Sequence, residues 1–557
     1  MSDPSKTSTP EPGALPPLWA VWRNPIVIRC WRARMRPRAF TPLALIVLLA
    51  CAFLFFFIFN LMTQRGGIEA ERAATAVLMP LFFIQAFLLL FSGTGAVAGG
   101  IVEEESMGMI DYQRLTPLPP AWKVVGYLFG LPIREYCLAA LVLPFLILVV
   151  VIGNVPLTSV LTVYAVLLSS TVLYHMTGYI AGLSVRNPRL AARTVQVAVV
   201  LLYILLPQLS AFGYVVFEHL TVRPVVIEQW GPLAVASYGG DVRRPEWQEV
   251  EIFGLGLPQA VFSLLIQGSL IAVAVTMALR KWKASSRHAL GRIPALALQG
   301  GAAFLILGNL LPLLERGIIF PSVAAAGRGG RWSFLFSGEA GAGEGGAVVA
   351  LFALILIVLG ALLVQAITPT HDESIRGLRR ARRLSWKRVP RTADEASALP
   401  WALGIGAVSA FVVHAFGRAM ATSDAMAGLN FPSGGILPLA LATLLPAVTL
   451  AAVSETWQKR GLTFLLLALW TFPALLALVL GAVSDTVAVP GFYVATLSPL
   501  TTPFIAMVGE GVAWEAAAAH SHPALIFGLT AQSALAIWTI TRCLRHHRSL
   551  ARSVHDA

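Results

Sequence analysis

The sequence is poor in charge and in cysteine. Only 12% of its 557 residues are charged, whereas 57% are hydrophobic. A soluble protein carries about 25% charged residues, so the low charge excludes a chain that packs in water alone, and lipid must solvate much of it. The four cysteines form no CxxC pair, which predicts neither a disulfide framework nor a metal site. The histidines of "RHH" (545–547) lie in a basic tail, where we expect a solvated cluster.

Several catalytic signatures are also missing from the sequence. It has no GxxxxGK[ST] phosphate loop, no HExxH and no GxSxG. We therefore expect no enzyme, no cofactor and no ATP hydrolysis by P-loop chemistry. The stretch "GTGAVAGG" has the look of a phosphate loop, but it lies in an apolar run. There Gly95 and Gly99 predict close packing between helices.

Long apolar runs are abundant. A helix that crosses a bilayer needs about 20 mostly apolar residues. The runs predict an all-α polytopic membrane protein with twelve transmembrane helices in two six-helix halves, 41–283 and 284–545. Residues 1–19 lack the apolar core of a signal peptide, so we expect a disordered cytosolic tail there, and 546–557 form a second, basic cytosolic tail. The predicted spans are 41–62, 74–100, 124–152, 158–183, 195–217, 256–279, 294–314, 347–368, 399–417, 434–454, 461–483 and 524–543.

The basic residues are distributed unevenly along the chain. Its net charge of +13 would fit a nucleic-acid partner. With a cytosolic N-terminus, however, most of the 41 Lys and Arg fall in the cytosolic tails and loops, as the positive-inside rule requires. We therefore predict a multi-pass protein of the plasma membrane (the inner membrane of a bacterium) with both termini cytosolic. Its basic face meets anionic lipid and no nucleic acid.

The last span of each half shares a pattern. Pro258–Arg280 aligns without gaps with Pro523–Arg545, and the alignment pairs Gln267 with Gln532. Parallel repeats of this kind occur in transporters. The match predicts one fold repeated in the two halves, against the alternative of two unrelated apolar helices.

An interrupted apolar segment precedes each of these last spans. The segments are Trp230–Gly240 and Val489–Val508, and the second contains three prolines. We expect both to be re-entrant or interfacial pieces on the external side, because broken backbone at membrane depth must be buried by protein.

The stretch Ile101–Gly126 interrupts the apolar runs with acids and prolines. Its first part has few helix breakers, and "TPLPP" ends a helix because proline lacks an amide donor. We predict a short helix and a turn that form a rigid elbow below the membrane. Met107, Ile110 and Leu115 are expected to face the membrane or a partner.

These residues carry a resemblance to a known family. Glu-x-x-x-Gly followed by Leu-Thr-Pro-Leu-x-Pro resembles the first cytosolic loop of ABC transporter permeases of the type-2, exporter-like class. In that family the loop carries the coupling helix that seats on the ATP-binding subunit. One departure is Met109, because the family usually has Thr after this Gly. The coupling residues that the resemblance implies are Glu103, Glu104, Glu105, Gly108, Asp111, Arg114, Leu115, Thr116, Pro117 and Leu118.

A second segment supports the same resemblance. "RNPIVIRCWRARMR" (23–36) is similar to the amphipathic helix that precedes the first span in this family, so we assign 20–40 to a connecting helix at the membrane surface. The resemblance implies an exporter subunit that couples to a separate ABC ATPase in two copies, with ATP bound by that partner. The connecting-helix residues are Asn24, Pro25, Arg29, Arg32 and Arg36.

The second half contains a weaker version of the elbow. "DESIRGLRRARRL" (372–384) aligns with Glu104–Leu115 after a one-residue insertion. It predicts a second coupling-like loop for the ATPase, whereas the plainer interpretation of its arginines is a topology anchor. The matched residues are Glu373, Gly377, Arg383 and Leu384.

Polar residues inside spans are functional candidates. Arg134 and Glu135 are adjacent in the third predicted span. Adjacent helical residues do not face each other, so we expect each to find its partner on another helix or in a cavity. Four glutamines either line a polar path or bond helices together: Gln85, Gln208, Gln267 and Gln532.

Two other functions fit parts of the sequence. An ion-coupled secondary transporter needs acids near the bilayer midplane, where Glu135 is the one candidate. A membrane-embedded transferase needs converging acids, and the external loop around Trp247 holds a cluster of them. A transporter could work as a homodimer or as an intrachain pseudo-dimer of its two halves.

Overall fold

The structure is a computed structural model. It describes residues 17–183, 187–211, 213–237, 249–284, 287–315, 342–386, 388–423, 432–483, 485–508 and 520–556. The predicted disordered tail and the acidic loop around Trp247 lie largely outside these residues. Contacts divide the chain into two compact units. Unit 1 comprises Met1–Leu206, Glu218–Glu249 and Pro258–Ser285, and unit 2 comprises Pro207–Phe217, Val250–Leu257 and Ser286–Ala557.

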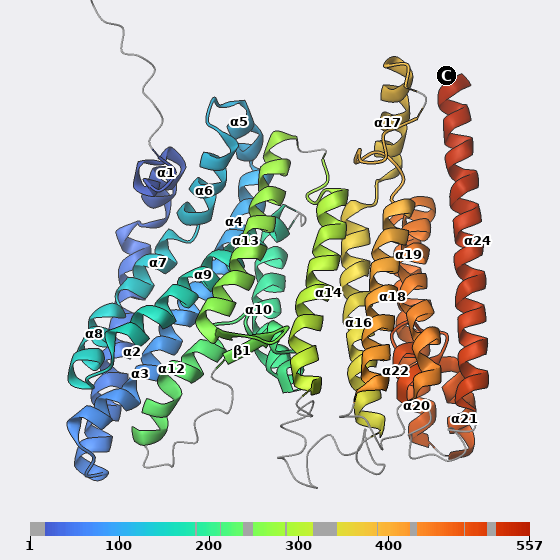
Figure 1. The fold of residues 1–557 in the computed structure, drawn as a ribbon. Helices are drawn as coiled ribbons and strands as arrows, with labels where there is room; N and C mark the ends of the chain where they lie inside the picture. The colour runs from blue at the N-terminus through green and yellow to red at the C-terminus, as the bar shows by residue number, and fades with distance from the viewer. Residues whose placement is uncertain are drawn as a thin grey trace, which may run out of the picture. The chain divides into compact units, whose positions relative to one another are not determined.

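Unit 1 consists of helices (Figure 1). Two π-helical segments, Leu61–Arg65 and Phe87–Gly93, continue α2 and α3. The helices that lie wholly or mostly in this unit are α1 (Pro25–Arg34), α2 (Pro37–Asn60), α3 (Ala70–Ala86), α4 (Thr94–Ser106), α5 (Met109–Leu115), α6 (Pro120–Gly130), α7 (Ile133–Ala140), α8 (Leu143–Ile152), α9 (Leu157–Gly182), α10 (Pro188–Ala211), α12 (Arg223–Ser237) and α13 (Gln259–Lys283).

The third predicted span is broken, which corrects the prediction of one helix over 124–152. α6 ends at Gly130 and α7 begins at Ile133, with Pro132 between them in a non-helical conformation. Proline cannot donate the backbone bond that would continue α6. The apolar length that could cross the bilayer is therefore Ile133–Ile152.

Close helix packing builds the centre of unit 1. A Cβ atom on Gly95 would lie 2.5 Å from the side chain of Gln196 on α10, and one on Gly99 would lie 3.3 Å from the carbonyl of Pro188. These two glycines therefore bring α4 against α10, as the sequence predicts. A second cluster around Tyr127 packs α6, α9 and α13 together.

Unit 2 is also mainly helical, with one short hairpin. The hairpin turns at Phe253 and Gly254, both with positive φ, and it is an addition to the all-helical prediction. The elements are α11 (Val215–Glu218), β1 (Glu249–Ile252), β2 (Leu255–Pro258), α14 (Arg292–Glu315), α16 (Ala342–Ile367), α17 (His371–Arg383), α18 (Leu399–Thr422), α19 (Ile436–Phe464), α20 (Phe472–Val483), α21 (Asp485–Ala495), α22 (Thr502–Val508) and α24 (Ser521–Asp556).

The core of unit 2 lies among its long apolar helices. Phe352 of α16 and Phe416 of α18 meet edge to face, with ring centroids 5.5 Å apart. The predicted interrupted segment before the last span is present as the two short helices α21 and α22. The last helix, α24, continues to Asp556, so the predicted basic tail is helical up to that residue.

Eleven helices within the described residues are long and apolar enough to cross a membrane. A shorter apolar helix, Leu465–Leu480, occupies most of the eleventh predicted span, 461–483. It follows α19 without a break in helical structure, and this explains why it does not form a separate long helix. The chain is an all-α polytopic membrane protein in its coarse architecture.

Candidate functional site

The elbow in unit 1 is built around one glycine. α4 ends at Ser106, and Gly108 adopts φ 71° before α5 begins at Met109. Glycine reaches this left-handed conformation without a steric penalty. The structure thus contains the short helix that the sequence predicts, and it lies beyond the end of α4 on the same side as α1 (Figure 1).

One face of α5 is fixed to unit 1. Ile110 is only 1% exposed and packs in the cluster that contains Tyr127 and Trp282. Arg114 pairs with Asp111, and its guanidinium carbon lies 5.9 Å from the centre of the Trp282 ring. The expectation that Ile110 faces a partner is therefore wrong, because this side chain anchors the elbow.

The opposite face of the elbow is exposed and partly apolar. Leu115 is 86% exposed, Tyr112 62% and Met107 59%. Glu103, Glu105 and Asp111 are exposed as well. Tyrosine and methionine are enriched at protein interfaces, so this face has the composition of a docking surface with an acidic border.

Glu104 ties the elbow to the connecting helix. Its carboxylate lies 2.6 Å from Nη2 of Arg29 on α1 and accepts a hydrogen bond of 3.2 Å from the Tyr127 hydroxyl. Burial lowers the pKa of Arg29, but the hydrogen bond and the charge of Glu104 outweigh it and raise this pKa above its ordinary value. Burial and the same carboxylate raise the pKa of Tyr127, so the phenol stays protonated and donates.

Asn24 caps α1 and fastens it to α6. Its Oδ1 accepts from the amide of Ile26 at 2.9 Å, as an N-cap residue does, and its Nδ2 donates to the carbonyl of Trp122 at 2.7 Å. A Cβ on Gly126 would lie 2.8 Å from Asn24 Oδ1, and one on Gly130 would lie 3.1 Å from the sulfur of Cys30. The two glycines therefore provide the groove that holds α1.

The other predicted residues of this region lie at its edges. Pro25, Arg32, Arg36 and Pro117 are exposed, whereas Leu118 is half-buried. Thr116 accepts a hydrogen bond of 3.2 Å from the Lys123 ammonium through its carbonyl.

The second coupling-like segment forms α17. A capping box between Thr370 and Glu373 starts this helix, and Nε2 of His288 lies 3.1 Å from the Glu373 carboxylate. Burial raises the pKa of Glu373, but the hydrogen bonds from His288 and Thr370 and the charge of His288 outweigh burial and bring this pKa to about 2. A guanidinium nitrogen of Arg382 donates to the carbonyl of Val554 on α24 at 2.7 Å.

The two aligned glycines have different structural roles. Gly108 turns the chain between two helices, whereas Gly377 lies inside α17. A Cβ on Gly377 would lie 2.5 Å from Cβ of Glu395, so this glycine permits close packing. Arg383 lies at the end of α17, and Leu384, the residue after it, is exposed.

Arg134 and Glu135 pair with each other, which corrects the prediction of separate partners. Nη2 and Nε of Arg134 lie 2.7 Å and 3.1 Å from Oε1 of Glu135. α7 begins at Ile133, so both residues lie in its first turn, where the long arginine side chain folds back to its neighbour. Glu135 itself is only 1% exposed.

Three of the predicted glutamines bond segments together. Gln85 on α3 donates to the carbonyl of Ala139 at 3.2 Å. Gln267 on α13 donates to the carbonyl of His219 at 2.9 Å, and Gln532 on α24 donates to the carbonyl of Thr496 at 2.9 Å. Gln532 therefore holds the interrupted segment Val489–Val508, whereas Gln267 holds the turn between α11 and α12, which precedes the segment Trp230–Gly240.

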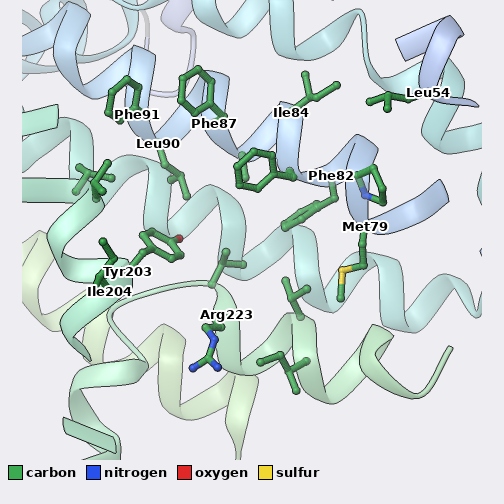
Figure 2. Close-up of a pocket in the computed structure, with 18 residues that line it drawn as sticks. Leu54, Met79, Phe82, Ile84, Phe87, Leu90, Phe91, Tyr203, Ile204 and Arg223 are labelled. Carbon is green, nitrogen blue, oxygen red and sulfur yellow. The ribbon is translucent and has the colours of Figure 1, made fainter. Parts of the chain in front are cut away.

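Unit 1 also contains an apolar cavity of about 860 Å³ (Figure 2). Phe82, Phe87 and Leu90 line one wall, while Tyr203 on α10 and Arg223 at the start of α12 line the other. Arg223 pairs with Glu218, so the lining offers hydrocarbon contacts and little free charge. The cavity can hold an apolar molecule or a lipid chain.

Sequence reasoning missed two residues of the elbow. Tyr127 and Trp282 form its floor, with ring centroids 5.9 Å apart. Trp282 could have been singled out from the sequence, because it lies between two lysines just after the last predicted span of the first half. Nothing in the sequence placed that end beside the elbow.

Three comparisons were made, with protein-family models, with curated proteins and with solved structures, and none of them gives a match to this chain.

Proposed function

We propose that this chain is the membrane-spanning permease subunit of an ATP-driven transporter of the ABC type-2, exporter-like class. A separate ATPase subunit would hydrolyse ATP, since the chain has no phosphate loop of its own. The observation that carries the proposal is the elbow. One face of α5 is fixed by Ile110 and Arg114, and the other exposes Tyr112 and Leu115.

A push on α5 would reach several elements of unit 1 at once. α5 follows α4 through Gly108, rests on Trp282 of α13 and leads into α6. Glu104 joins this assembly to α1 through Arg29. A coupling element needs such rigid connections, because a flexible loop would absorb the displacement that ATP binding produces.

The finer architecture is part of the same proposal. Twelve transmembrane helices would form two halves, each with a re-entrant external segment before its last helix. The matching contacts of Gln267 and Gln532 favour this repeat. The two halves would act as an intrachain pseudo-dimer on two ATPase copies, α5 and α17 each meeting one copy, in the plasma membrane with both termini cytosolic.

The apolar cavity favours a cargo with a hydrocarbon part. Its lining is almost entirely aliphatic and aromatic, which suits lipid-like molecules better than ions. The acid required by an ion-coupled transporter is also engaged, since Glu135 pairs with Arg134. The cavity and this pair both favour the ATP-driven function.

A photo-crosslinking experiment tests the docking surface. A photoreactive amino acid replaces Leu115 of the full chain in its native membrane, and the adduct is identified by mass spectrometry. We expect a polypeptide with a P-loop. The matched control replaces Leu255, an exposed leucine of the β2 hairpin strand, and should not give this adduct. Absence of a P-loop protein from the Leu115 adducts would contradict the proposal.

Accessibility tests the predicted orientation. A cysteine introduced as Ser106→Cys should react with a membrane-impermeant maleimide only after the cells are permeabilised. The unmodified chain is the control, since three of its four cysteines are buried and Cys137 is half-buried. Labelling in intact cells would place the elbow outside and refute the coupling function.

A further inference from the structure

A buried carboxylate lies near the end of α19 in unit 2. Glu455 is 5% exposed, and its Oε1 accepts hydrogen bonds of 2.5 Å from the amide of Ala398 and 3.1 Å from the hydroxyl of Ser397. These contacts fix the orientation of the carboxylate. Its second oxygen, Oε2, points toward α24.

Two further donor atoms meet Oε2 from one face of α24. Cys543 and His547 are four residues apart, so their side chains lie one above the other on the helix. The sulfur of Cys543 is 3.3 Å from Glu455 Oε2, and Nε2 of His547 is 2.5 Å from it. The three ligand atoms all lie within 4.8 Å of one another.

We propose that Glu455, Cys543 and His547 form a binding site for a zinc-like divalent transition metal. Sulfur, imidazole nitrogen and carboxylate oxygen are the three ligand types that zinc uses in proteins, at about 2.0–2.3 Å. Donor atoms this close need only small adjustments to surround one ion. Sequence spacing does not bring this cluster together, because Glu455 is distant in sequence from the other two residues.

The charge of the cluster suits a divalent ion. A thiolate and a carboxylate carry two negative charges, and a neutral imidazole adds none, so a 2+ ion gives a neutral site. Neutrality matters here because burial makes an unbalanced charge costly. Loading the metal releases the thiol proton, and a bond from His547 Nε2 to the ion replaces its hydrogen bond to Glu455.

The surrounding residues support the ligands. The guanidinium of Arg292 donates to the carbonyls of Arg391, Asp394, Ala396 and Ser397. It therefore holds in place the segment whose Ser397 and Ala398 orient Glu455. Outer contacts of this kind tune metal affinity. The three protein ligands leave a fourth position for water or for an external ligand.

The alternative state is a hydrogen-bonded triad without metal. In it His547 and the thiol of Cys543 both donate to Glu455, which satisfies the geometry equally well. A metal titration separates the two states, because only metal binding converts the thiol into a coordinated thiolate.

The test uses the full-length protein in detergent, stripped with a chelator and titrated with Co²⁺ alone. We expect one equivalent to bind with a thiolate-to-cobalt charge-transfer band, and Zn²⁺ to displace it. Cys543→Ser should abolish the band, and His547→Gln and Glu455→Gln should weaken cobalt binding by about tenfold or more. Ser397→Ala, which leaves the ligands intact, should weaken it by roughly tenfold.

Matched variants make the result specific. Cys51→Ser removes a buried cysteine of unit 1, and His546→Gln removes the histidine next to His547. Both should keep the band at full strength. A wild-type protein without the band, or a Cys543→Ser protein that keeps it, would overturn the metal site and leave the hydrogen-bonded triad. If Cys543→Ser does not fold, an unchanged cobalt affinity in His547→Gln overturns it equally.

Discussion

Gln267 donates its side-chain amide to the backbone carbonyl of His219, 2.9 Å away. The acceptor precedes α12, and the donor lies in the middle of α13. In unit 2 Gln532, its sequence counterpart, makes the same kind of bond to Thr496. The position four residues earlier also meets the same segment in each unit, through Ser263 in one and through Gly528 in the other. The two units thus share the spacing of these contacts along α13 and α24.

Removing either glutamine amide should loosen the segment that it contacts, at His219 or at Thr496. We expect Gln267→Ala and Gln532→Ala each to lower the free energy of unfolding by about 1 kcal/mol, because a buried carbonyl loses its donor. Thermal unfolding of the detergent-solubilised chain measures the change. Ser269→Ala is the control, since this hydroxyl is exposed and bonds only within its own helix. Equal stability of wild type and both glutamine variants would show that these hydrogen bonds do not stabilise the fold.

Gly126→Ala should displace α1 from α6. The new Cβ would lie 2.8 Å from both Asn24 Oδ1 and Ile26 Cβ, and such overpacking costs about 1–3 kcal/mol. Cys30, which is buried beside Gly130, should then react faster with maleimide, as peptide mapping by mass spectrometry would reveal. Gly268→Ala is the matched control, because its added Cβ meets open space. An unchanged rate at Cys30 would mean that α1 does not depend on this groove.

Arg29 and Glu104 should behave as one unit in a double-mutant cycle. The single changes Arg29→Ala and Glu104→Ala each remove the 2.6 Å contact, so the second change adds little to the first. We expect a coupling of about 1 kcal/mol in unfolding free energy. Arg32→Ala with Glu104→Ala gives the comparison cycle, since Arg32 is exposed on the same helix. Additive effects in the first cycle would rule out the ion pair as the clamp on α1.

The sequence predicted the elbow because its determinants are local. Gly108 supplies the turn and the prolines end the short helix, so neighbouring residues alone set the bounds of α5. The pairing of Arg134 with Glu135 was not predicted, because helical periodicity points adjacent side chains in different directions and takes no account of how far a long arginine side chain reaches. The cluster at Glu455 was missed for another reason. Glu455 lies on α19, and its partners come from the two residues before α18 and from α24. Only tertiary packing brings these three segments together.

Acid should weaken the attachment of α17. The pKa of Glu373 is about 2 in the folded protein, below the value of about 4.3 for an unfolded glutamate. This depressed pKa stabilises the fold fully above about pH 4.3, and the contribution is lost as the pH falls toward 2. The difference in thermal stability between wild type and Glu373→Gln should therefore be constant near neutral pH and shrink in acid.

Asp372→Asn controls for a general acid effect, because Asp372 is exposed on the same turn of α17. The difference in thermal stability between wild type and Asp372→Asn should not shrink in acid in the way expected for Glu373→Gln. A Glu373→Gln difference in thermal stability that persists undiminished at the acid end would mean that the charge of Glu373 does not stabilise α17.

The gap between α6 and α7 has a mechanical consequence. Pro132 has no amide hydrogen to donate and lies outside both helices, so α6 and α7 are joined by a short link and do not form one continuous rod. If α5 meets an ATPase as proposed, a displacement at Leu115 would pass through α6 to this link before it reaches α7. Such a link would allow α6 to tilt without α7 moving by the same amount.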